Sequence, residues 1–281
     1  MPTTLVDIQT LKHHLKDPHW VVVDCRFDLQ QPKAGRVAYV DTHIPGARYA
    51  DLNKDLSSPP TSKSGRHPLP DPNILAAKLG QWGIQQQTQV VAYDASGGAI
   101  AGRLWWLLRW LGHDAVAVLD GGWQAWQAAG FALQQDFPLM QPTQFITKLQ
   151  PHLVLETAAV QQGLGDNTIT LLDARGRARY AGEVEPLDPV AGHVPGAMNR
   201  PFEQNLTAQG VFLPGDELRA QFAGYASNPQ QVVHMCGSGI TACHNLLAME
   251  VAGLRGSRLY AGSWSEWIRD PARKVKKGDE A

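Results

Sequence analysis

The sequence predicts an α/β protein built from two similar domains, each with a mostly parallel sheet flanked by helices on both faces. Three observations support this fold class. The chain has 281 residues, which exceeds the usual length of one domain. Short apolar segments rich in β-branched residues alternate with helical segments, as is typical of parallel sheets. The same motifs also occur twice, once in each half of the chain.

The expected strands are short apolar runs that end in a polar residue or cysteine. Because they lack polar alternation, both of their faces are predicted to be covered by helices. Two longer apolar stretches between them are the clearest helices. The expected strands are 21–25, 89–94, 115–120, 168–173 and 231–236, and the two helices are 102–112 and 241–253.

The internal repeat is carried by motifs that keep their order in both halves. VVVDCR at 21–26 is followed by HIPGA at 43–47, and TLLDAR at 170–175 is followed by HVPGA at 193–197. The two HxPGA segments are predicted to be turns. Further on, a GGW segment in the first half corresponds to GSW at 262–264 in the second half.

The repeat also predicts the domain boundaries. We expect a first domain at 1–135, a linker at 136–152 that contains three prolines, and a second domain at 153–281. The two copies differ at the strand-to-helix loop, where Asp94 stands in the first half and Cys236 in the second.

Composition excludes several function classes. The 25 lysines and arginines nearly balance 26 aspartates and glutamates, so no strong field attracts nucleic acid or an anionic membrane. No apolar run is long enough for a signal peptide or a membrane span, and a cytoplasmic location is expected. Three cysteines without a CxxC pair argue against a disulfide framework or a zinc site. No metal or organic cofactor is expected.

The loop CGSGIT at 236–241 is the strongest chemical signal. It places Cys236 where a parallel strand ends and a helix begins, which is the usual ligand-binding end of an open sheet. Small residues allow backbone amides to point at one spot, and the helix adds its positive end. This field favours a nucleophilic thiolate and an anionic persulfide on Cys236. Cys25 and Cys243 are expected to be core residues.

These motifs together resemble the tandem-domain rhodanese and mercaptopyruvate sulfurtransferase family over about residues 1–270. The resemblance implies a catalytic C-terminal half and a degenerate N-terminal half without the cysteine. It also implies that a small-molecule donor passes sulfur to Cys236, and that cyanide or a thiol such as thioredoxin accepts it.

The loop sequence bears on the donor. Mercaptopyruvate-using members resemble CGSGVT and thiosulfate-using members resemble CRKGVT, so CGSGIT favours 3-mercaptopyruvate, with thiosulfate as the alternative. The resemblance implies that Arg179 binds the donor carboxylate and that His67 and Ser238 take part in a relay. Two family positions differ, since Leu187 replaces a second arginine and Asn53 replaces an aspartate. The remaining loop residues expected to bind substrate are Gly237, Gly239, Ile240 and Thr241.

Two readings from other classes compete. A cysteine phosphatase loop consists of a cysteine, five further residues and then an arginine that neutralises the phosphoryl oxygens, and in this chain Ala242 stands at the position of that arginine. A binding module that has lost catalysis also fits the fold. Replacement of Cys236 by serine distinguishes these two interpretations, because an enzyme would lose all of its activity and a binding module would keep its function.

Overall fold

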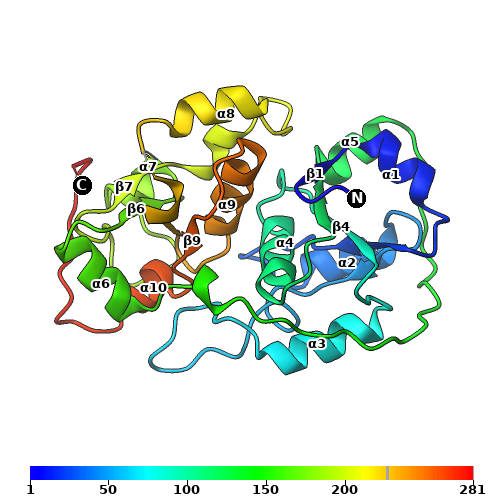
Figure 1. Cartoon of the computed structure of the whole chain (residues 1–281), viewed down its shortest axis with the longest axis horizontal. Helices are drawn as coiled ribbons and strands as arrows, with labels where there is room; N and C mark the ends of the chain where they lie inside the picture. Colours follow the sequence, from blue (N-terminus) through cyan, green and yellow to red (C-terminus); the bar gives the residue numbers. More distant parts are fainter. Residues whose placement is uncertain (226–227, 281) are drawn as a thin grey trace. The chain divides into compact units, whose positions relative to one another are not determined.

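In the computed structural model, which describes residues 1–225 and 228–280, the chain folds into two compact units (Figure 1). Unit 1 comprises Met1–Ser58, Pro70–Gln150 and Ala208–Phe212. Unit 2 comprises Pro59–Leu69, Pro151–Thr207 and Leu213–Ala281. Each unit thus contains one short segment from the other half of the sequence, and segment 59–69, which carries His67, belongs to unit 2.

Unit 1 contains a parallel sheet with the strand order β1-β5-β4-β2-β3. Its central strands β2 and β4 pair in register, with Val22 opposite Val91. Almost every residue of these two strands is buried, as their β-branched, non-alternating sequences predict. The strands are β1 (Leu5–Val6), β2 (Trp20–Asp24), β3 (Arg48–Tyr49), β4 (Gln89–Tyr93) and β5 (Val116–Leu119).

Unit 2 repeats this arrangement with the strand order β7-β6-β8-β9, again all parallel. The central pair is β6 and β8, with Leu171 opposite Val233. The predicted fold class is therefore confirmed, as two parallel sheets flanked by helices. The strands are β6 (Thr170–Asp173), β7 (Met198–Asn199), β8 (Val232–Met235) and β9 (Arg258–Leu259).

Helices connect the strands in both units. The two predicted helices are present as α4 and α9, and both are buried almost all round. In unit 1 the helices are α1 (Ile8–His14), α2 (Ala34–Asp41), α3 (Pro72–Gln81), α4 (Ala101–Trp110) and α5 (Gly122–Ala128). In unit 2 they are α6 (Thr157–Gly165), α7 (Arg177–Tyr180), α8 (Gly215–Phe222), α9 (Ala242–Val251) and α10 (Ser263–Trp267), with 3₁₀ turns at Pro151–Leu153, Phe202–Asn205 and Pro229–Gln231.

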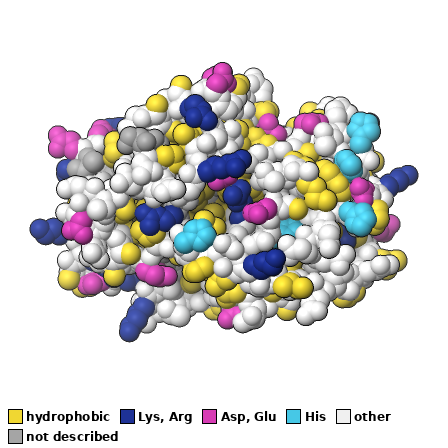
Figure 2. Space-filling model, in the orientation of Figure 1, with side chains coloured by type: hydrophobic (Ala, Val, Ile, Leu, Met, Phe, Trp, Pro, Cys, Tyr) yellow, Lys and Arg dark blue, Asp and Glu magenta, His cyan; other side chains and the backbone are white. Residues whose placement is uncertain are grey.

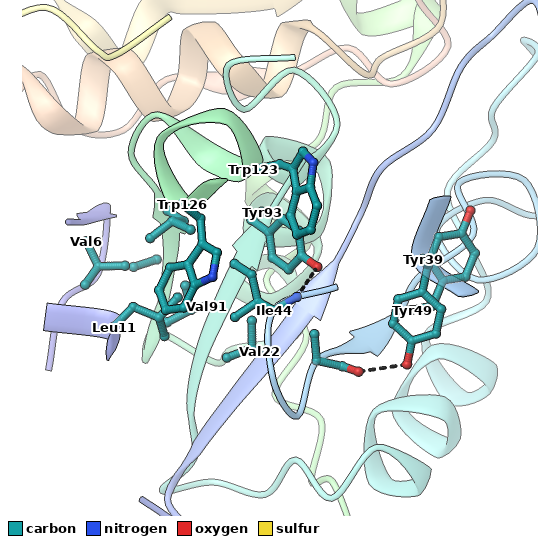
Figure 3. Close-up of a cluster of buried hydrophobic side chains, with 13 residues drawn as sticks. Val6, Leu11, Val22, Tyr39, Ile44, Tyr49, Val91, Tyr93, Trp123 and Trp126 are labelled. Carbon is teal, nitrogen blue, oxygen red and sulfur yellow. Dashed lines mark hydrogen bonds between the residues drawn. The ribbon is translucent and has the colours of Figure 1, made fainter. Parts of the chain in front are cut away.

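Each unit has its own hydrophobic core. The core of unit 1 joins β-branched strand residues to the rings of Tyr93, Trp123 and Trp126 (Figure 3). The hydroxyl of Tyr93 accepts a hydrogen bond from the backbone amide of Ile44 in the HIPGA turn. The core of unit 2 is similar in kind and contains Trp264 and Trp267 at the matching position.

The repeated motifs make the same contacts in both units. In unit 1, Tyr39 stacks on His43 of the HIPGA turn, with ring centroids 4.2 Å apart. In unit 2, Tyr180 stacks on His193 of the HVPGA turn at 3.9 Å. Both histidines bond through Nδ1 to the backbone carbonyl of the tyrosine on which they stack. This shared geometry supports the interpretation of the chain as a duplication.

Charges of both signs are interspersed on the face drawn in Figure 2, in agreement with the near-zero net charge of the chain. Within the described residues, no helix is long and apolar enough to cross a membrane.

Candidate active site

The predicted chemical loop lies at the carboxyl end of a central strand of unit 2. Strand β8 ends at Met235 and helix α9 begins at Ala242, so Cys236 and the five residues after it form the connection. Thr241 is the residue that precedes the helix. This edge of a parallel sheet collects loops and helix N-termini, and it is where open α/β sheets bind ligands.

Two backbone amides of this loop point at the sulfur of Cys236. The N–H groups of Gly239 and Ile240 donate to Sγ over 3.1 and 3.2 Å. Gly239 has a φ of +76°, and a Cβ atom there would lie 2.4 Å from the carbonyl oxygen of Ala261. Only glycine fits this backbone and this space. The loop thus presents hydrogen-bond donors to whatever charge develops on the sulfur.

The backbone of Cys236 is fixed from the other side by the start of α10. Its amide donates to Oγ of Ser263 over 3.1 Å, and the same hydroxyl donates to the carbonyl of Tyr260 over 2.9 Å. The carbonyl of Cys236 accepts from the amide of Trp264 over 3.0 Å. The backbone of Cys236 is therefore held by hydrogen bonds through both its amide and its carbonyl, and the residue is only 2% exposed.

His67 and Ser238, which are far apart in sequence, meet in unit 2. Nδ1 of His67 and Oγ of Ser238 are 2.7 Å apart, and both side chains are buried. Because a histidine can donate or accept at this nitrogen, the pair can pass a proton in either direction. The other position of the expected relay, Asn53, belongs to unit 1 and is exposed.

Arg179 lies on α7 with its guanidinium group beside the loop. Its Nη2 is 2.7 Å from Oε1 of Glu185 and 3.5 Å from Oδ2 of Asp188. Glu185 also accepts from the backbone amides of Leu187 and Asp188, at 3.0 and 3.2 Å. Leu187 therefore belongs to a loop that is organised around the carboxylate of Glu185, the partner of Arg179, although Leu187 offers no charge of its own.

Sequence reasoning missed Arg66, whose guanidinium group lies beside that of Arg179. A Cβ atom at position 237 would lie 3.0 Å from Nη2 of Arg66 and 3.4 Å from Nη2 of Arg179. Gly237 therefore leaves room for two cations next to Cys236. No local pattern could reveal Arg66, because its place depends on how segment 59–69 packs in unit 2.

A third arginine is buried behind the loop. Arg175 pairs with Asp173 at 2.7 Å and with Glu185 at 3.4 Å. Burial alone would lower the pKa of Arg175, but the charges of Asp173, Glu185 and Cys236 outweigh burial and raise it. An equivalent pair, Arg26 with Asp24 at 2.7 Å, exists in unit 1, so the pair itself is part of the scaffold.

The matching loop of unit 1 holds a carboxylate where unit 2 holds the sulfur. Asp94 accepts four backbone N–H groups at 2.7 to 2.9 Å, from Ser96, Gly98, Ile100 and Ala101. This loop is a built anion cradle that is filled by its own side chain. Cys25 and Cys243 are both fully buried, which confirms that they are core residues.

Comparison with known proteins places these features in context. A family model for the rhodanese-like domain matches residues 7–129 and 156–270. A probable 3-mercaptopyruvate sulfurtransferase from Pseudomonas aeruginosa is 49% identical over 279 residues, covering 98% of this chain and 98% of that protein. A putative thiosulfate sulfurtransferase, SseB from Mycobacterium tuberculosis, is 39% identical over 261 residues, covering 92% of this chain and 90% of that protein.

Among solved structures, SseA from Escherichia coli, described as a 3-mercaptopyruvate sulfotransferase with the rhodanese fold, has a TM-score of 0.81 and 32% identity. The match covers 94% of this chain and 100% of that chain.

Proposed function

Because the chain belongs to the tandem-domain rhodanese family of sulfurtransferases, we propose that it moves sulfur from 3-mercaptopyruvate to an acceptor through a persulfide on Cys236. The observation that carries this proposal is the pair of loop amides, from Gly239 and Ile240, that donate to Sγ of Cys236. A thiolate and a persulfide anion both gain from these donors, so the loop suits a sulfur that is first a nucleophile and then a carrier.

In the first half-reaction the Cys236 thiolate attacks the thiol sulfur of the donor. The carbon–sulfur bond of the donor breaks, its electron pair goes to carbon, and the enolate of pyruvate leaves. The proton of the donor thiol ends on that carbon, so the cysteine persulfide and pyruvate are the products. We assign the transfer of this proton to Ser238 and His67, which are 2.7 Å apart.

In the second half-reaction an acceptor attacks the outer sulfur, and the Cys236 thiolate leaves unchanged. Cyanide or a thiol such as thioredoxin is the proposed acceptor. We assign Arg179 to the donor carboxylate, because a guanidinium group matches its geometry and this one lies beside Gly237. Gly237, Gly239, Ile240 and Thr241 then bind the donor through the loop backbone.

Unit 1 is proposed to be a non-catalytic copy, because Asp94 already fills its anion cradle. We further propose that the first domain ends at residue 135 and that the second begins at residue 153. A cytoplasmic location is proposed because three free cysteines fit a reducing compartment.

Thiosulfate is the second candidate donor. Two arginines beside Gly237 suit a dianion, and the relative from Mycobacterium tuberculosis is named for thiosulfate. The neutral loop around Ser238 favours the monoanionic donor instead, since it offers no further cation.

The test is the intact mass of the protein after brief exposure to 3-mercaptopyruvate or to thiosulfate. We expect a gain of about 32 mass units, one sulfur atom, with 3-mercaptopyruvate and none in Cys236→Ser. A gain with thiosulfate alone would reverse the donor assignment. No gain with either donor would support the binding module, which needs no reactive cysteine.

A further inference from the structure

We infer that Asp188, a buried carboxylate that contacts both Arg66 and Arg179, sets the charge of the donor that the site beside Cys236 accepts; the two arginines together are termed the anion clamp. The inference rests on the proposed function for the identity of the donors. It adds a selectivity role for a carboxylate. The observations are the position of Arg66, the ion pairs of Asp188 and the charge of the whole cluster.

The position of Arg66 is fixed by backbone hydrogen bonds and close packing of segment 64–66, in addition to the contacts of its side chain. Its amide donates to Oγ of Ser265 on α10 over 3.0 Å. The preceding Gly65 packs so closely that a Cβ atom there would lie 2.6 Å from the carbonyl oxygen of Gly262. Nε of Arg269 donates to the carbonyl of Ser64 over 3.2 Å. Segment 64–66 is therefore fixed against α10, the helix whose start also holds Cys236.

Asp188 lies between the two guanidinium groups. It pairs with Nη1 of Arg66 and lies 3.5 Å from Nη2 of Arg179, and its side chain is only 3% exposed. Arg66 and Arg179 remain 25% and 22% exposed, so an anion that enters the site can still reach them. A buried carboxylate that touches both cations weakens their attraction for any incoming anion.

The charges linked by these contacts cancel before a donor binds. The cluster holds three guanidinium groups and three carboxylates in one chain of ion pairs. Its members, in order of contact, are Arg66, Asp188, Arg179, Glu185, Arg175 and Asp173. A monoanionic donor adds one negative charge to this neutral cluster, and the dianion thiosulfate adds two. Because thiosulfate carries two negative charges, its repulsion by Asp188 is about twice that of a monoanion. Asp188 therefore selects for the monoanionic donor.

The first test compares kcat/KM for both donors in Asp188→Asn and in a matched control, Glu183→Gln. The control removes the same charge from an exposed carboxylate that pairs with Arg177. We expect the thiosulfate to 3-mercaptopyruvate ratio of kcat/KM to rise about tenfold in Asp188→Asn, from one charge acting at short range. The ratio in Glu183→Gln should stay within about twofold of the unaltered protein. An unchanged ratio in Asp188→Asn, or an equal rise in the control, overturns the role of Asp188.

A second measurement needs no sulfur transfer. Iodoacetate, an anion, and neutral iodoacetamide alkylate the Cys236 thiolate by the same displacement of iodide, so the ratio of their rates reports the local potential. We expect this ratio to fall about tenfold in Arg66→Gln, to rise in Asp188→Asn, and to be largely kept in Arg66→Lys. Arg177→Gln, an exposed arginine, is the matched control and should leave it unchanged.

The two failures are distinguishable. If the unaltered protein gains sulfur from neither donor, the proposed function fails, and the alkylation ratio still judges the clamp. If the ratio is the same in Arg66→Gln, Arg177→Gln and the unaltered protein, Arg66 does not act on anions at this site.

Discussion

Ser263 shows how a single strained residue supports the backbone of Cys236. It has a φ of +54°, which is unfavourable for a side chain with a Cβ atom, and the corresponding residue of unit 1 is Gly122 with a φ of +52°. Unit 2 therefore carries a serine where glycine is better suited to the backbone. The hydroxyl compensates by accepting from the amide of Cys236 and donating to Tyr260.

This predicts that Ser263→Ala and Ser263→Gly differ in unfolding free energy but slow persulfide formation equally. Ser263→Ala keeps the strained φ and leaves two buried groups unpaired, so it should lose about 1 to 3 kcal/mol of unfolding free energy. Ser263→Gly should be more stable than Ser263→Ala by about 1 kcal/mol, because glycine accepts this φ. Both should slow persulfide formation by a similar factor, about tenfold, since both release the amide of Cys236.

Urea unfolding measures the change in unfolding free energy. The rate at which the protein gains about 32 mass units, one sulfur atom, measures persulfide formation. If the rate in Ser263→Gly returns with its stability, the hydroxyl has only a structural role.

At the scale of single elements, the two strand-to-helix loops differ in what fills the cradle. Four amides converge on Asp94 in unit 1, whereas two converge on the sulfur in unit 2. The carboxylate is thus a scaffold group of the loop between β4 and α4. Its replacement should affect folding and leave the chemistry of the other unit intact.

We therefore predict that Asp94→Ala lowers the unfolding free energy by about 3 kcal/mol, because four buried N–H groups lose a charged acceptor. Asp94→Asn keeps one oxygen and should lose less. Chemical denaturation checks the order of the three proteins. The persulfide yield of folded Asp94→Ala should match that of the unaltered protein, and a loss of yield in the folded variant would contradict a purely structural role.

The central strands could be predicted from sequence within two residues at either end. QVVAYD at 89–94, for example, is strand β4 at Gln89–Tyr93. Such strands are recognisable because both faces are buried and β-branched residues dominate. The edge strands β3 and β7 have two residues each, and two residues carry no periodic pattern. Their positions depend on pairing with β2 and β6, which only the folded chain supplies.

At the scale of the whole molecule, the duplication was visible in the motifs, whereas the exchange of short segments between the units was not. Cys236 and its loop could be found because the chemistry is contiguous in sequence. The contact of His67 with Ser238 was expected only through family resemblance, and Arg66 was missed. Segment 59–69 has no apolar period, and it is placed by glycine packing and backbone hydrogen bonds against α10.

Each unit also buries a histidine in its neutral form, which couples the stability of the molecule to pH. Burial, reinforced by the charge of Arg200, lowers the pKa of His234 to about 3, and burial lowers the pKa of His113 in unit 1 as well. Nε2 of His234 lies 3.1 Å from the sulfur of Met249, and its Nδ1 has no hydrogen-bond partner among the described residues. A proton is therefore poorly accommodated on His234 in the folded protein.

In the unfolded chain the pKa of this histidine returns to about 6.5, so between about pH 6.5 and about pH 3 the unfolded state binds more protons than the folded state. The stabilising contribution is complete above the unfolded pKa and is lost progressively as the pH falls through this window. Between pH 7 and pH 5 the loss from His234 alone is about 2 kcal/mol.

We predict that the unfolding free energy, measured with urea, falls between pH 7 and pH 5 by about 2 kcal/mol less in His234→Leu than in the unaltered protein, because the substitution removes the proton-binding group. His113→Leu should reduce the pH dependence in the same direction, since its pKa is also lowered by burial. The comparison is made within each protein between the two pH values, so any packing cost of the leucine cancels. An equal loss in all three proteins would show that other groups govern the response to acid, because a histidine that stays neutral in the fold must contribute this difference when it is removed.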